Sequence, residues 1–200
     1  MIAIIDYNVG NVGSIYNMLK NLNQEVDITR DPDKILNADK LILPGVGSFD
    51  NGMKNLKCLG LIETLNEAVI VRKKPILGIC LGMQLMATRS DEGNELGLNW
   101  IELSVESFKN HINYTGTLPV MGWNYIDSFK ENILVGNERP RFYFVHSYFF
   151  PINDYCILKA EINNFQYCVG FKKENVIGVQ FHPEKSNKFG MRLLTKFCEL

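Results

Sequence analysis

The sequence predicts an α/β fold: a mostly parallel central sheet flanked by helices, with additional antiparallel strands in the C-terminal half. In the first half, strand-like and helix-like segments alternate, and the strands are continuous apolar runs. Such runs are typical of parallel strands that are covered on both faces. The second half carries strand-like segments joined by short turns such as KKEN. Because 200 residues contain no repeat and no linker-like stretch, one domain is expected over residues 1–200.

The expected elements follow in chain order. Residues 11–23 have apolar side chains at helical spacing, and Asp31 followed by Pro32 is a helix-opening pair. The strands expected in the first half are 1–6, 25–29, 40–49 and 75–80, and the helices are 11–23, 31–38, 52–73 and 81–90. The second half is expected to form strands over 100–109, 121–129, 141–150, 155–162 and 165–182, and a terminal helix over 188–200.

Composition excludes several classes of function. The net charge is −1 and the basic residues are scattered, so nothing indicates a surface for nucleic acid or for an anionic membrane. No apolar run approaches membrane-spanning length, and no basic region precedes the first apolar run. The five cysteines form no CxxC pair, which argues against a zinc site or a disulfide framework. We therefore expect a cytoplasmic protein without a metal or a cofactor.

Cys80 stands out among the five cysteines. Gly78 and Gly82 frame it as G-x-C-x-G between an apolar strand and a helix-like segment. This is the cysteine form of the nucleophile elbow, a strained turn that exposes the reactive side chain. A helix that begins after Cys80 favours thiolate over thiol, and the N–H of Leu81 would point at a developing oxyanion. A simple buried thiol with glycines for close packing is the alternative.

A thiolate nucleophile needs a base, and the chain has three histidines. His111 lies in a polar stretch and is expected at the surface, whereas His146 follows aromatic residues and is expected to be a buried, hydrogen-bonded histidine. His182 ends a buried strand in VIGVQFHPEK, and Pro183 favours extended geometry there. Because residues i and i+2 of an extended chain face the same way, Glu184 can orient one ring nitrogen while the other faces Cys80. An ordinary strand-end turn is the alternative.

The segment ILPGVGSF supplies a second strand end, with glycines on both sides of Val46. A loop flanked by glycines can turn a peptide N–H towards a substrate oxygen or away from it. The alternative is a plain turn.

The motifs GICLGMQ and FHPEKS together resemble the class I, triad-type glutamine amidotransferases. LPGVGSF, MGWN and FYFVHSY are similar to those of the glutaminase subunits of imidazole glycerol phosphate synthases, and the resemblance covers essentially the whole chain. It implies that Cys80 attacks the carboxamide of glutamine, that His182 transfers protons and that Glu184 orients His182.

The resemblance also implies the remaining site residues. The N–H groups of Val46 and Leu81 are the expected oxyanion donors. The residues expected to bind or contact glutamine are Gly45, Gly47, Gln84, Glu92 and Ser147. The residues expected to meet a partner subunit are Trp123, Asn124, Tyr143 and Lys185, and a core position is the alternative for Trp123. The partner implied is a (β/α)₈-barrel cyclase in a heterodimer, which uses the ammonia to make imidazole glycerol phosphate and aminoimidazole carboxamide ribotide in histidine biosynthesis.

Other functions remain open from the sequence. Val120 stands where the family usually has a histidine, and ELGLNW and KSNKFGMRLL resemble a paralogous subgroup that serves sugar amidation in surface-polysaccharide synthesis. A stand-alone cysteine hydrolase is a further alternative, and a catalytically silent binding subunit is another. The intact set of Cys80, His182 and Glu184 argues against the silent subunit.

Overall fold

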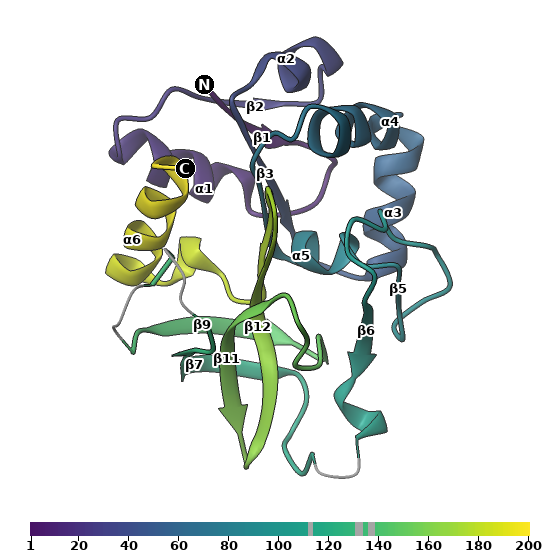
Figure 1. The fold of residues 1–200 in the computed structure, drawn as a ribbon, viewed down its shortest axis with the longest axis vertical. Coiled ribbons are helices and arrows are strands. Elements are labelled where there is room, and N and C mark those ends of the chain that lie inside the picture. The colour runs from purple at the N-terminus through teal and green to yellow at the C-terminus, as the bar shows by residue number, and fades with distance from the viewer. Residues whose placement is uncertain (112–113, 131–133, 136–138) are drawn as a thin grey trace.

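A computed structural model describes residues 1–111, 114–130, 134–135 and 139–200 (Figure 1). Its largest sheet has the strand order β2-β1-β3-β4-β13-β12-β11-β8. The parallel strands are β1 (Ile2–Ile5), β2 (Val26–Thr29), β3 (Lys40–Gly45), β4 (Ile76–Cys80) and β13 (Val176–Val179). The antiparallel strands are β8 (Asp127–Ser128), β11 (Cys156–Ile162) and β12 (Phe165–Lys173). The predicted fold class is therefore confirmed.

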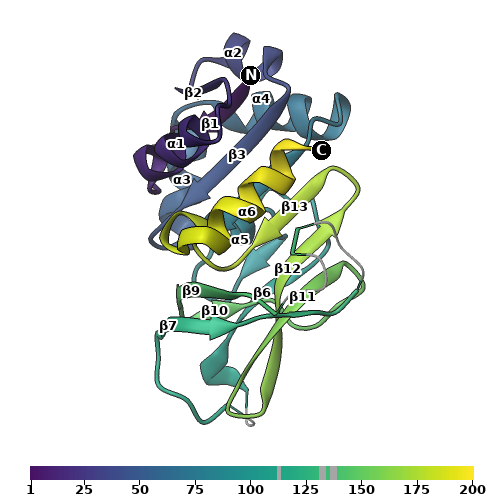
Figure 2. The ribbon, with the colours of Figure 1, turned by 90° about the vertical axis from the view of Figure 1, so that its left-hand side faces the viewer.

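Helices cover both faces of the parallel strands (Figures 1 and 2). On one face lie α1 (Val12–Asn21) and α6 (Asn187–Cys198), whose apolar side chains pack with Ile4 and Leu77. On the other face lie α2 (Pro32–Asn37), α3 (Phe49–Cys58), α4 (Leu61–Asn66) and α5 (Leu81–Leu85), which share a core cluster with Leu43. As the sequence predicts, Pro32 begins α2, and the carboxylate of Asp31 accepts the N–H of Asp33 at 2.9 Å.

Two expected helices are wrong in extent. The single helix expected over 52–73 divides, because Gly60 adopts a left-handed φ of +66° between α3 and α4. A π-helical turn (Glu67–Val71) then ends the segment. The helix expected over 81–90 ends at Leu85, and β5 (Arg89–Ser90) pairs with β6 (Ser104–Ser107) instead. Pairing with a distant strand overrides the local helical pattern there.

Two small sheets lie at the carboxyl ends of the parallel strands (Figure 2). One is the antiparallel ribbon of β7 (Val120–Tyr125) and β9 (Arg141–His146). The other has the order β10-β6-β5, in which β10 is Tyr148–Phe149. The strand expected over 141–150 is thus interrupted at Ser147, which lies between β9 and β10. This break lets the chain leave one small sheet and join the other directly above Cys80.

Within the described ranges, no helix combines the length and the apolar character that a bilayer-spanning segment requires.

Candidate active site

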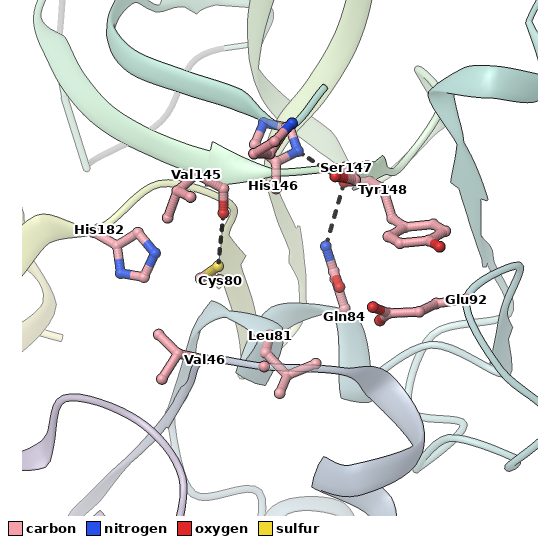
Figure 3. A pocket seen from close by; sticks show the side chains of 12 residues that line it. Val46, Cys80, Leu81, Gln84, Glu92, Val145, His146, Ser147, Tyr148 and His182 are labelled. Carbon is pink, nitrogen blue, oxygen red and sulfur yellow. Dashed lines mark hydrogen bonds between the residues drawn. The ribbon is translucent and has the colours of Figure 1, made fainter. Parts of the chain in front are cut away.

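Cys80 occupies a strained turn at the end of β4. Its backbone has φ 54° and ψ −111°, a conformation that side-chain-bearing residues rarely adopt, and α5 begins at the next residue. The glycines around it are required by packing. A Cβ at Gly82 would lie 1.8 Å from the carbonyl oxygen of Leu43, and one at Gly78 would lie 2.7 Å from the side chain of Met86. The turn holds the sulfur at the wall of a cavity of about 300 Å³ (Figure 3).

His182 lies beside Cys80 on the neighbouring strand end, and both line the cavity (Figure 3). Its Nδ1 is 2.8 Å from Oε1 of Glu184, and both side chains are only 1% exposed. The Nε2 atom is buried without a hydrogen-bond partner in the protein. Burial alone lowers the pKa of His182, but its interactions with Cys80 and Glu184 outweigh burial and raise the pKa to about 10. These interactions favour the protonated form of the imidazole.

Glu184 reaches His182 by a different route from the expected extended chain. Only His182 has extended geometry, with φ −102° and ψ 95°, and Pro183–Lys185 form a 3₁₀ turn. The turn folds the Glu184 carboxylate back beneath the imidazole and directs Lys185 outward. Ser186 closes the turn, because its hydroxyl donates to the carbonyl of His182 at 2.6 Å.

The two expected oxyanion donors follow the ends of two neighbouring parallel strands, because Gly45 of β3 pairs with Cys80 of β4 (Figure 3). Val46 follows β3 and is 41% exposed, whereas Leu81 begins α5 and is buried. The glycines on the two sides of Val46 are required for different reasons. A Cβ at Gly45 would lie 2.7 Å from Gly82, Leu81 and Tyr7, whereas Gly47 has open space around it but a φ of +112°.

The remaining predicted substrate residues lie on the other side of the cavity (Figure 3). The Glu92 carboxylate accepts the N–H of Phe49 at 2.8 Å. Burial raises the pKa of Glu92, partly offset by that hydrogen bond. Ser147 lines the wall beside Tyr148. The amide nitrogen of Gln84 points to protein acceptors, because it donates to the Oε1 atom of Gln180 at 2.9 Å and to the carbonyl of Tyr148 at 3.4 Å.

The other two histidines differ in burial. His146 is buried, and its Nδ1 lies 2.7 Å from the carbonyl oxygen of Tyr148, as expected for a hydrogen-bonded core histidine. Burial lowers the pKa of His146 to about 4. His111 reaches the surface as expected but is only 31% exposed, because the ring packs against Phe149 and its Nε2 lies 2.6 Å from the carboxylate of Glu106.

The predicted partner residues gather outside the cavity. Trp123 is 43% exposed and meets the Tyr143 ring edge-on, with centroids 6.2 Å apart, so the alternative of a core tryptophan is wrong. The ammonium of Lys185 lies 5.7 Å above the centre of the Tyr143 ring. Asn124 faces the other way, and its amide donates to the carbonyl of Glu161 at 3.2 Å.

The sequence analysis missed one residue of this site, Gln180. Its side chain is fully buried, and its amide nitrogen lies 3.7 Å from the sulfur of Cys80. The spacing Gln-x-His would have indicated it, because the same i, i+2 rule that aims His182 also applies to Gln180.

The cavity has the parts needed to cleave a small amide. The Cys80 thiol, the His182 imidazole and two candidate backbone donors surround one side of it, and the half-buried Glu92 carboxylate, which could hold a substrate ammonium, lies on the other. The described residues contain no cluster of His, Cys, Asp and Glu side chains suited to hold a metal ion.

Comparisons with known proteins agree with this geometry. Residues 3–199 match the family described as glutamine amidotransferase class-I. Two relatives are named imidazole glycerol phosphate synthase subunit HisH 2. The one from Methanococcus maripaludis is 50% identical over 100% of this chain and 99% of its own length. The one from Pseudomonas aeruginosa is 44% identical over the full length of both. Subunit HisH 1 of Campylobacter jejuni is 42% identical, again over the full length of both.

Solved structures share the fold at much lower identity. One described as a glutamine amidotransferase superimposes with a TM-score of 0.76 at 19% identity and covers 100% of this chain and 98% of its own. A chain from the structure of PurLQS of Thermotoga maritima has a TM-score of 0.72 at 17% identity, covering 99% and 97%.

Proposed function

Because this chain belongs to the class-I glutamine amidotransferases, we propose that it hydrolyses glutamine through Cys80, His182 and Glu184 and passes the ammonia to a partner enzyme. The observation that carries the proposal is the position of His182. One ring nitrogen is held by Glu184, and the other is buried, unpaired and adjacent to the strained Cys80. A histidine with only a structural role would have both nitrogens satisfied.

The chemistry follows from these three groups. The Cys80 thiolate attacks the carboxamide carbon of glutamine, and the C–N bond breaks as the His182 imidazolium gives its proton to the departing ammonia. A thioester and a neutral imidazole remain. His182 then removes a proton from water, whose hydroxide attacks the thioester. Glutamic acid leaves and ionises, and the thiolate and imidazolium return. The Glu184 carboxylate stabilises the imidazolium in both resting and final states.

Recognition of glutamine uses the other side of the cavity. We assign Glu92 to the α-ammonium group of glutamine, because it brings a half-buried carboxylate to the cavity wall. The wall at Gln84 and Ser147 lies beside it and would hold the rest of the amino-acid head, and Gly45 and Gly47 shape the loop that carries Val46.

The partner proposed is the (β/α)₈-barrel cyclase of a histidine-synthesis heterodimer. The relatives' names support this, since they are subunits of imidazole glycerol phosphate synthase. The face formed by Trp123, Tyr143 and Lys185 supports it physically, because exposed aromatic side chains are enriched at interfaces, whereas Asn124, which we also propose to meet the partner, bonds to Glu161. Arg141 lies 5.3 Å above the Trp123 ring, so the face presents cations around aromatic rings and suits a partner surface with carboxylates.

The partner would also switch hydrolysis on. Val46 can donate to the oxyanion only when its N–H points into the cavity, and the positive φ of Gly47 marks where the loop could turn. An oxyanion donor contributes roughly 10²–10³ in rate, so rotation of one peptide would gate the reaction. Contacts that differ between the two loop states would let the partner bias this rotation.

The experiment measures glutamate release by the purified chain alone, with a barrel cyclase, and with the cyclase plus its nucleotide substrate. Activity that appears only with the cyclase supports the proposal. Full activity of the free chain would support a stand-alone cysteine hydrolase instead. Activation by a sugar-amidating enzyme but not by the cyclase would support the polysaccharide pathway. Val120, which stands where the family usually has a histidine, is one reason to test that pathway. Cys80→Ser is the control, and it should fold normally and release almost no glutamate.

We further propose that residues 1–200 act as one glutaminase domain and that the protein works in the cytoplasm. All five cysteines are unpaired, which suits a reducing compartment.

A further inference from the structure

Gln180 lies directly beside the nucleophile because of strand register. Strands β13 and β4 are parallel, with Val179 opposite Ile79, so the next residues along are Gln180 and Cys80. The two side chains leave their strands at the same level of the sheet. The Nε2 atom of Gln180 is 3.7 Å from the sulfur, and the backbone N–H of Gln180 is separately held by the carbonyl of Val169 at 2.9 Å.

The direction of the Gln180 amide is fixed by a second glutamine. The Nε2 atom of Gln84 donates to the Oε1 atom of Gln180 at 2.9 Å. Because an acceptor is required at that position, the oxygen of Gln180 faces Gln84 and its NH₂ group faces Cys80. Gln180 is fully buried, so water cannot compete for this N–H. The two successive hydrogen bonds, from Gln84 to Gln180 and from Gln180 to Cys80, therefore direct one N–H donor at the sulfur.

We propose that the side-chain amide of Gln180 is a catalytic donor that stabilises the anionic sulfur of Cys80. The inference rests on the proposed role of Cys80 as nucleophile. His182 and Gln180 stand two residues apart on one strand end, so the imidazolium and the amide both reach the sulfur from that strand. A hydrogen bond to a charged acceptor is stronger than one to a neutral group, so the donor favours thiolate over thiol.

The titratable groups around the sulfur are the same in the parent protein and in Gln180→Met. They are His182 with Glu184 behind it, His146 and Glu92 in the cavity wall, and Tyr7 beneath the turn, where burial and the charge of Cys80 raise the pKa of its phenol. Tyr7 itself donates to the carbonyl of Pro44 at 2.5 Å. None of these hydrogen bonds involves Gln180, so Gln180→Met removes one neutral donor and changes no charge, whereas Gln180→Glu replaces that donor with a carboxyl group.

The test is the rate of Cys80 alkylation by iodoacetamide between pH 4 and 10, followed by mass spectrometry of the Cys80 peptide. Alkylation forms a C–S bond at the thiolate and releases iodide, so the rate follows the thiolate fraction. We expect Gln180→Met to move the midpoint of the profile to higher pH and to slow alkylation at pH 7 about three- to tenfold. Gln180→Glu, which has the same shape, should move the midpoint further because its carboxylate repels the thiolate.

Matched controls are Gln166→Met and Gln166→Glu on the exposed part of β12, where the side chain of Gln166 bonds to Lys159 and Glu161. These should leave the profile in place. The plateau rate at high pH reports access to the sulfur, so a packing defect lowers the plateau without moving the midpoint. Parent-like midpoints in both Gln180 variants would overturn the inference. If the parent Cys80 were not alkylated at all, the proposed nucleophile itself would be wrong, which is a distinct outcome.

Discussion

The backbone N–H of His182 donates a hydrogen bond to the backbone carbonyl of Tyr143, with an N···O distance of 2.9 Å. The N–H of Tyr143 in turn donates to the hydroxyl of Ser186 at 3.0 Å, and that hydroxyl donates to the carbonyl of His182. Strand β9 is therefore fastened to the turn that carries the proposed base. Because the Tyr143 ring lies on the proposed partner face, these hydrogen bonds connect that face directly to the proposed base.

Ser186→Ala should lower kcat for glutamine while changing KM little, because the hydrogen bonds of the Ser186 hydroxyl position His182 and do not contact the substrate. It should also lower the free energy of unfolding by about 1–3 kcal/mol, since it leaves the Tyr143 N–H without its acceptor. Steady-state kinetics with the partner present and urea unfolding measure the two effects. Thr195→Ala on α6, which also removes a hydroxyl that bonds the backbone, is the control and should keep parental kinetics. A parental kcat in Ser186→Ala would contradict the coupling.

His182→Ala should reduce glutamate release by about 10²–10⁴-fold, the usual contribution of a positioned acid and base. Glu184→Gln should cost distinctly less, because the amide still orients the ring but no longer stabilises the imidazolium. The double variant should be little worse than His182→Ala alone, since Glu184 acts through His182. Near-normal turnover of His182→Ala would show that the triad is wrong. His146→Asn serves for comparison and should lose less activity, because His146 transfers no proton.

Asp50 should control affinity for glutamine through Glu92. Its Oδ1 atom accepts the N–H groups of Asn94 at 3.0 Å and Glu95 at 2.9 Å, and these bonds hold the pKa of Asp50 below its usual value. A side chain at Gly93 would collide with this carboxylate, since a Cβ there would lie 1.9 Å from Oδ1. The loop that carries Glu92 therefore packs closely against Asp50 and is held by its carboxylate.

Asp50→Ala should raise KM for glutamine by about tenfold with a smaller change in kcat, because a loosened Glu92 binds the ammonium group less well. Asp50→Asn keeps an acceptor oxygen and should recover most of the affinity. The exposed Asp33 on α2 offers a control, Asp33→Ala, with parental KM. If Asp50→Asn were as impaired as Asp50→Ala, the acceptor role would be refuted.

His146 should make the fold sensitive to acid. Its pKa is about 4 in the folded protein against 6.5 for the free side chain. Between these values the unfolded chain binds a proton that the folded protein does not, so stability falls as pH drops from 6.5 through 4. The full loss is about 3 kcal/mol.

The variant His146→Asn keeps a donor near the Tyr148 carbonyl but cannot take up that proton. Urea unfolding from pH 7 to pH 4 should therefore show a shallower loss of stability in the variant than in the parent. Equal slopes would mean that His146 is not the buried neutral group described here.

Local patterns determined much of this protein without any structure. Continuous apolar runs that alternate with helix-like segments predicted the parallel sheet, because a strand buried on both faces must be apolar throughout. The elbow at Cys80 was visible because the close approach of Gly82 to β3 admits no side chain. The pair of His182 and Glu184 was visible because the two residues are two apart in the sequence, so their contact depends only on a short local turn. The route between them, a 3₁₀ turn, was not.

Contacts between distant segments were decided only by the tertiary structure. The helix pattern over 81–90 yielded to a pairing of β5 with β6, and Gly60 divided the longest expected helix. Whether Trp123 lay in the core or on a face depended on which side of the β7–β9 ribbon met the sheet, and a strand pattern does not specify that. Gln180 came to the sulfur through the register of β13 against β4, strands separated by almost half the chain. Register is set by the summed packing of both strands with the helices that cover them, so no single segment of sequence carries it.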